Sequence, residues 1–132
     1  MRVWRVAHKT ATQNGFPSGP YNGKGVPVEQ YELLWSMGSD HSDAYHPSPY
    51  ADPELHHIAA HERCGFNSLN ALNKWFDGWV EALDGAGFAV YEYDVPDWAA
   101  RVGRFGQVVF SADEAVEVSS HDFRPVQMTL FA

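Results

Sequence analysis

Arginine and histidine stand three residues apart near the start of the chain, at Arg5 and His8. An arginine fork binds a phosphate group through two parallel N–H···O bonds, a geometry that lysine does not offer. Arg5 therefore has the chemistry to hold a phosphate group. The spacing is also common by chance, so the alternative is that Arg5 faces solvent and His8 merely ends a strand.

A second group of chemically active side chains is His57, His61 and Cys64. If residues 54–63 form a helix, these three lie on one side of it and resemble a set of first-row metal ligands. Two upstream histidines could complete such a site: His41 and His46. The flanking residues do not repeat a zinc spacing and a second cysteine pair is missing, which favours a solvated histidine face and no metal.

The end of the chain carries a five-residue pattern, Gln-x-x-Leu-Phe. It comprises Gln127, Met128, Leu130 and Phe131. The pattern resembles the peptide by which bacterial replication proteins dock on the DNA polymerase sliding clamp, with the glutamine setting the register and the apolar side chains entering pockets. Residues 119–125 are expected to act as a leash for it. The alternative is a final strand in which Val126, Met128 and Leu130 face inward.

The composition limits the classes of function. The chain has 132 residues, 45% of them apolar, one cysteine and a formal net charge of −8. This is a single domain with enough apolar material for a core, and its charge opposes binding to nucleic acid or to an anionic membrane. No secretory leader, membrane span, phosphate-binding loop or hydrolase elbow is recognisable, so we expect a soluble cytoplasmic protein.

The elements that would position these residues can be read from the apolar spacing. We expect strands at Arg2–His8 (central), Cys64–Phe66, Phe88–Val95 and Gln107–Phe110, helices at Glu29–Met37, Glu54–Arg63 and from Ser68 through Leu83, and a helical turn at Pro96–Arg101. Long loops cover 9–27 and 39–53. The pattern predicts an α+β fold, a single compact domain with a small mixed or antiparallel sheet and three to four short helices.

The order of these elements resembles the small, often phage-borne proteins related to the ADP-ribosyltransferase fold, over residues 2–118. The resemblance is carried by Arg5 and His8 on the first strand, by Gly19-Pro20-Tyr21, by Gly65-Phe66-Asn67-Ser68-Leu69, and by the strands 90–96 and 107–110. It implies that Arg5 and His8 bind NAD, that Tyr21 contacts the nicotinamide, and that Gln107 occupies the position where the family has a catalytic glutamate. It also implies a domain at 1–118 followed by a C-terminal segment at 119–132.

Two functions follow as alternatives. The first is an NAD-dependent protein of the ADP-ribosyltransferase type that modifies or blocks a macromolecular target near the replication machinery. The second is a non-catalytic acidic interaction protein, of the phage inhibitor or adaptor kind, that binds a protein partner such as the sliding clamp. Position 107 holds glutamine and not glutamate, so no carboxylate is available there for catalysis, and both alternatives remain.

Overall fold

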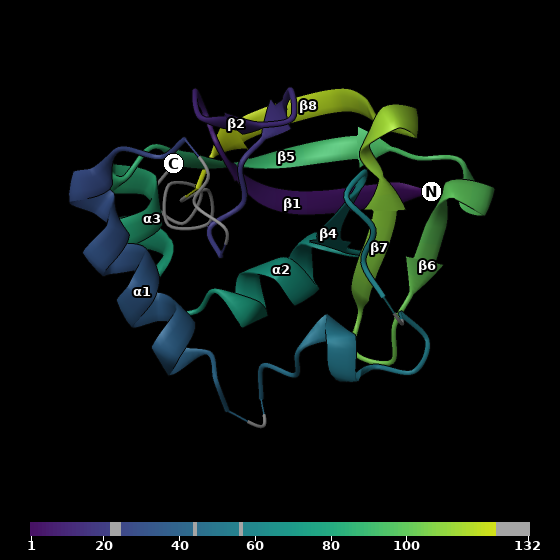
Figure 1. Ribbon diagram of the computed structural model, residues 1–132, viewed down its shortest axis with the longest axis horizontal. Coiled ribbons are helices and arrows are strands. Elements are labelled where there is room, and N and C mark those ends of the chain that lie inside the picture. The colour runs from purple at the N-terminus through teal and green to yellow at the C-terminus, as the bar shows by residue number, and fades with distance from the viewer. Residues whose placement is uncertain (22–24, 44, 56, 124–132) are drawn as a thin grey trace, which may run out of the picture.

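A six-stranded antiparallel sheet forms the centre of the molecule (Figure 1). The structure is a computed structural model that describes residues 1–21, 25–43, 45–55 and 57–123. The sheet contains β1 (Arg2–His8), β4 (Glu62–Phe66), β5 (Phe88–Asp94), β6 (Ala100–Val102), β7 (Gln107–Ser111) and β8 (Val116–Asp122), in the order β6-β7-β4-β1-β5-β8. A small hairpin is formed by β2 (Thr12–Gln13) and β3 (Phe16–Pro17). The helices in the described residues are α1 (Tyr31–Asp40), α2 (Leu69–Trp75) and α3 (Val80–Gly85).

The two faces of the sheet are covered by different elements, because alternate residues of a strand point to opposite faces. On one face Val6, Phe88 and Val90 pack in a cluster that also holds Leu34, Met37, Leu72, Phe76 and Leu83 of the helical region. On the other face Val3, Ala7, Tyr93 and Phe110 pack with Phe16 of the hairpin. In Figure 1 the helices α1 and α2 lie below β1 and β5, and the hairpin lies above them.

The predicted α+β class, the antiparallel sheet, the presence of three short helices in the described residues and the central position of the first strand are confirmed. Two helical predictions need correction in detail. The helix expected from Ser68 through Leu83 is interrupted, because Gly78 takes a φ of +86° and separates α2 from α3. The turn expected at Pro96–Arg101 is helical only at Asp97–Ala99, and β6 follows it.

The helix predicted at Glu54–Arg63 is wrong. Turns and irregular backbone occupy the described residues of this range before β4 starts at Glu62. The Arg101 side chain donates to the carbonyl oxygens of Leu55 at 2.9 Å and His57 at 2.9 Å. A helix would need these carbonyl oxygens for its own backbone hydrogen bonds. Here tertiary hydrogen bonds from Arg101 take their place.

The leash expected at 119–125 is a strand as far as Asp122, since β8 pairs with β5 from Val116 to Asp122. Phe123 follows it and is fully buried against Phe76. The boundary that we placed after residue 118 therefore falls inside β8. The clamp-like pentapeptide and its alternative as a last strand, 126–131, lie outside the described residues.

No helix in the described part of the chain is long and apolar enough to cross a membrane.

Candidate functional site

A cleft of about 980 Å³ opens where β1 and β4 part. The two strands, both fully described, are in register at a single pair, Trp4 and Phe66. Beyond that pair, Arg5 and Val6 of β1 line one wall of the cleft, and residues 62–66 of β4 line another. The loop after α1 and the C-terminal end of α2 complete the cleft. The cleft is therefore bounded by segments that are far apart in the sequence.

Glycine at two positions permits the close approach of backbone at this cleft. A Cβ on Gly65 would lie 2.6 Å from Val3 Cγ1 and 2.8 Å from the Trp4 carbonyl oxygen. A Cβ on Gly19 would lie 2.9 Å from Nη2 of Arg5. The sequence therefore places glycine where β4 comes closest to β1 and where the Gly/Pro-rich loop passes over Arg5.

Arg5 lies at the inner end of the cleft and is 7% exposed. Its Nη1 donates to the Cys64 carbonyl at 2.7 Å and its Nη2 to the Pro17 carbonyl at 3.3 Å. Burial lowers the pKa of Arg5 to about 10, which leaves the guanidinium charged at neutral pH. Arg5 thus bridges the parted strands and supplies a buried positive charge.

Arg63 of β4 is a second buried arginine in the same cleft, also 7% exposed. It donates to the carbonyl oxygens of Ala60 at 2.8 Å, Glu62 at 2.8 Å and Gln13 at 2.9 Å. The guanidinium carbons of Arg5 and Arg63 each lie 5.8 Å from the centre of the Phe16 ring. The sequence analysis did not identify Arg63, because a single arginine in a strand carries no motif.

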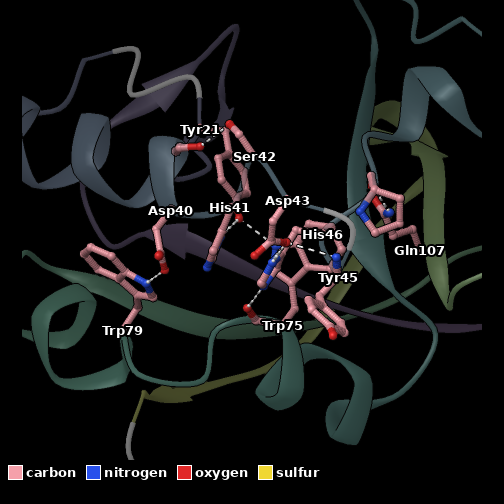
Figure 2. Close-up of polar contacts among 12 residues, drawn as sticks. Tyr21, Asp40, His41, Ser42, Asp43, Tyr45, His46, Trp75, Trp79 and Gln107 are labelled. Atoms are coloured by element: carbon pink, nitrogen blue, oxygen red, sulfur yellow. Dashed lines mark hydrogen bonds and ion pairs between the residues drawn. The ribbon is translucent and has the colours of Figure 1, made fainter.

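Tyr21 stands at the rim of the cleft in a hydrogen-bonded chain of side chains (Figure 2). Trp75 Nε1 donates to the Tyr21 hydroxyl at 2.6 Å, and the hydroxyl is hydrogen-bonded to Nδ1 of His41. Burial raises the pKa of Tyr21, and burial together with the nearby His46 lowers the pKa of His41. The phenol therefore keeps its proton and donates to a neutral imidazole.

His46 lies flat against His41, with ring centres 4.0 Å apart and planes at 11°. Its Nε2 faces the Trp75 carbonyl at 2.9 Å and its Nδ1 faces Asp43 Oδ1 at 2.8 Å (Figure 2). Both partners are oxygen acceptors, so His46 satisfies both bonds when both ring nitrogens carry hydrogen. The bond to His46 lowers the pKa of Asp43. The cluster ties the loop after α1 to the end of α2.

Gln107 lies on the helical side of the cleft, in register with Phe66. It is 4% exposed, and its Nε2 donates to the Pro47 carbonyl at 2.7 Å. The side chain thereby holds the loop that forms the outer wall. The three predicted residues Arg5, Tyr21 and Gln107 accordingly line one cleft.

His8 lies elsewhere. Its ring packs edge-on against Phe88 on the helical face, whereas Arg5 packs against Phe16 on the hairpin face. Its Nδ1 accepts from the Ala11 amide at 2.9 Å, and its Nε2 is 3.1 Å from the Ala86 carbonyl. Two positions that are three apart on a strand point to opposite faces, so His8 holds two turns together and does not line the cleft.

The helix that would have aligned His57, His61 and Cys64 is absent, and with it the geometric reason for a metal site. His57 and His61 are exposed, and Cys64 is a strand residue whose thiol pKa is raised by burial. Among the described residues no group of three or more His, Cys, Asp or Glu side chains could hold a metal ion.

The fold and the cleft define a small α+β protein with a ligand-sized cavity at a split in its sheet. A family model described as the bacteriophage T4 Y00F protein matches residues 1–124, and the chain belongs to this family of phage proteins. Comparison with curated proteins and with solved structures gave no match.

The sequence analysis missed the packing of His41, His46 and Trp75 around Tyr21. The sequence indicates His41 and His46 only as extra metal ligands, and Trp75 falls within the helix expected from Ser68 through Leu83. A histidine pair in a polar loop has no signal that distinguishes it from a solvated loop, because the stacking depends on how α1 and α2 meet.

Proposed function

We propose that this phage protein binds NAD in the cleft, as an ADP-ribosyltransferase-like protein that modifies or blocks a macromolecular target. The observation that carries the proposal is the convergence of Arg5, Tyr21 and Gln107 on one cleft. These residues come from the first strand, the Gly/Pro-rich loop and a late strand. They are the positions that the resemblance to ADP-ribosyltransferases implies for the ligand, and His8 is the exception.

Each of the three side chains has chemistry that suits part of NAD. The Arg5 guanidinium is a cation for the diphosphate. The Tyr21 side chain is 52% exposed and is fixed in orientation by its hydroxyl, so its ring can stack on an aromatic base. Gln107 supplies a neutral amide, which can hydrogen-bond a ribose hydroxyl but gives no negative charge to an oxocarbenium-like centre.

Binding is tested by titrating NAD and following the melting temperature. NAD at 100 times its Kd stabilises the folded state by about 2.7 kcal/mol. We expect this shift in the wild type and its loss in Arg5→Ala. The matched control is Arg2→Ala on the same strand, where the arginine is exposed and pairs with Glu92 at 2.8 Å. A wild-type protein without any shift at millimolar NAD would contradict the proposal.

Release of nicotinamide from NAD by the wild type separates an enzyme from a protein that only binds. Because Gln107 is uncharged, we expect release to be slow without a macromolecular acceptor. Transfer to a host protein is measured with labelled NAD in a bacterial extract, with Arg5→Ala as the control that lacks the phosphate contact.

A second candidate function rests on the C-terminal pentapeptide. The family match ends at residue 124, and Gln127, Leu130 and Phe131 follow it. We propose as the alternative that this segment docks on a bacterial sliding clamp. Replacing these three residues by alanine is expected to abolish clamp binding and leave the melting temperature unchanged. A wild type that never binds a clamp, or a triple variant that unfolds, would contradict the alternative.

A further inference from the structure

Two buried arginines in the cleft lack an acidic partner. Neither Arg5 nor Arg63 forms an ion pair with a carboxylate of the described residues. The charged and ionisable groups that act most strongly on Arg5 are Cys64, Tyr93 and Arg63 itself. Two like charges therefore lie close together at the inner end of the cleft, in a protein whose formal net charge is −8.

The hydrogen bonds of the two guanidiniums are incomplete. A guanidinium has five N–H groups. Arg5 donates to two carbonyl oxygens and Arg63 to three. The Nε atom of each is buried without a hydrogen-bond partner among the described residues. Because these Nε atoms are buried, the donors that can serve a further acceptor are the remaining N–H groups on the Nη atoms of the two side chains.

A buried cation is costly unless it is paired, and the Phe16 ring recovers only a part of that cost. Arg101 shows the usual solution in this protein, because its Nη1 lies 2.5 Å from Glu62 Oε2. Glu62 is the acidic residue next to Arg63, yet its carboxylate is bound by Arg101. The charges of Arg5 and Arg63 are thus left for a group that is not part of the described chain.

We infer that Arg5 and Arg63 together form a site for a diphosphate group, with the Phe16 ring beside both guanidiniums. The inference deepens the proposed function and rests on it. It assigns the ligand class as a nucleoside diphosphate or dinucleotide, held by its diphosphate at the inner end of the cleft. Arg63 becomes a binding residue that neither the motif nor the resemblance indicated.

The wild type provides a test that needs no variant. The probes are NAD, ADP-ribose, inorganic pyrophosphate and nicotinamide riboside, which lacks a diphosphate. Calorimetric titration is expected to give binding for the first three and at least about tenfold weaker binding for nicotinamide riboside, since hydrogen bonds to charged groups contribute strongly. Pyrophosphate is expected to compete with NAD.

Variants of Arg63 test whether this residue belongs to the diphosphate site. Arg63→Lys keeps a positive charge but loses the fork, and Arg63→Gln loses the charge. We expect NAD affinity to fall about tenfold or more in Arg63→Gln, and by less in Arg63→Lys. Arg2→Gln removes one positive charge from β1 outside the cleft, so it controls for net charge and is expected to bind NAD as the wild type does.

The outcomes separate the inference from the proposed function. NAD binding that is unchanged in Arg63→Gln would overturn the inference and leave the proposed function standing. Pyrophosphate and ADP-ribose binding without NAD binding would support the diphosphate site and overturn the proposed function. If Arg63→Gln does not fold, the wild-type series decides: nicotinamide riboside binding as tightly as NAD, or no competition by pyrophosphate, would overturn the inference.

Discussion

Strand β1 meets its two neighbours in different ways. Along β5 it is in register from Arg2 with Asp94 to His8 with Phe88. Along β4, which is fully described, it is in register at Trp4 with Phe66 alone. The first junction is a continuous backbone ladder with apolar side chains on both faces. The second is held by one strand pair, close glycine packing and the Arg5 bond to the Cys64 carbonyl.

This difference explains where the cleft lies. A continuous ladder leaves no space for a ligand between strands, because neighbouring strands lie about 4.8 Å apart. A split ladder creates a wall of backbone and side chains on each side. The two buried arginines that lack a carboxylate partner in the described residues, Arg5 and Arg63, line the open junction of β1 with β4, whereas packed apolar side chains flank the junction of β1 with β5.

The largest expected effect comes from adding a side chain at the tight contact between β4 and β1. In Gly65→Ala the new methyl group would meet Val3 Cγ1 and the Trp4 carbonyl oxygen, so β4 must move away from β1. We expect a loss of about 3 kcal/mol in the free energy of unfolding, measured by urea denaturation. The matched control is Gly38→Ala in α1, where a Cβ meets nothing within 4 Å. It should stabilise by about 0.5–1 kcal/mol.

A Gly65→Ala protein as stable as the wild type would mean that β1 and β4 are not held at this distance. The split would then be a loose junction and not a built wall of the cleft.

A smaller effect is expected at Arg101, which has a carboxylate partner in Glu62. Arg101→Met removes the bonds to Glu62 and to the carbonyl oxygens of Leu55 and His57. We expect a loss of about 2 kcal/mol in the free energy of unfolding. NAD affinity should fall as well, because the Glu62 carboxylate, which lines the cleft next to Arg63, then loses its partner and is left to pair with Arg63.

Unchanged NAD affinity in Arg101→Met would contradict the role given to the unpaired charge of Arg63. Titration of NAD at several ionic strengths measures the affinity, with Arg63→Gln as the comparison that is expected to reduce its salt dependence.

The sequence predicted the elements at the junction of β1 with β5 better than those around the junction of β1 with β4. Apolar residues in 2–8 and 88–94 predict strands, and most of these residues are buried because both faces of β1 and β5 are covered. Ser68, where a helix is expected to begin, caps α2 by accepting the Ala71 amide. The error at 54–63 has a tertiary cause, since Arg101, 40 or more residues away, takes the carbonyl oxygens. Arg5, Tyr21 and Gln107, which the resemblance implies for one ligand, line one cleft, whereas His8 does not, because positions three apart on a strand point to opposite faces.

Arg63 and the histidine pair could not be predicted from local pattern. Arg63 becomes a partner of Arg5 only through the strand register, which sets it diagonally across Gly65 on the same face. His41 and His46 come together only through the path of the loop between α1 and the 3-10 turn at Pro49–Ala51.

The smallest expected effect concerns the rim of the cleft and its dependence on pH. Folding lowers the pKa of His41, through burial first and the charge of His46 second. Below the pKa of an unfolded histidine, about 6.5, the unfolded chain binds a proton that the folded protein refuses. Stability is therefore expected to fall as the pH is lowered through this value, and to stop falling once the lower pKa of the folded state is passed.

Two variants isolate this contribution. Unfolding of His41→Gln, followed between pH 7.5 and 5.5, should show a shallower loss of stability than the wild type. His57→Gln, at an exposed histidine, should follow the wild type. Because protonated Nδ1 of His41 has no lone pair for the Tyr21 hydroxyl, the same pH range should also weaken NAD binding in the wild type. Equal slopes in the wild type and His41→Gln would show that His41 does not contribute to the pH dependence of stability, and NAD affinity that is unchanged over this pH range would show that binding does not depend on the Tyr21–His41 bond.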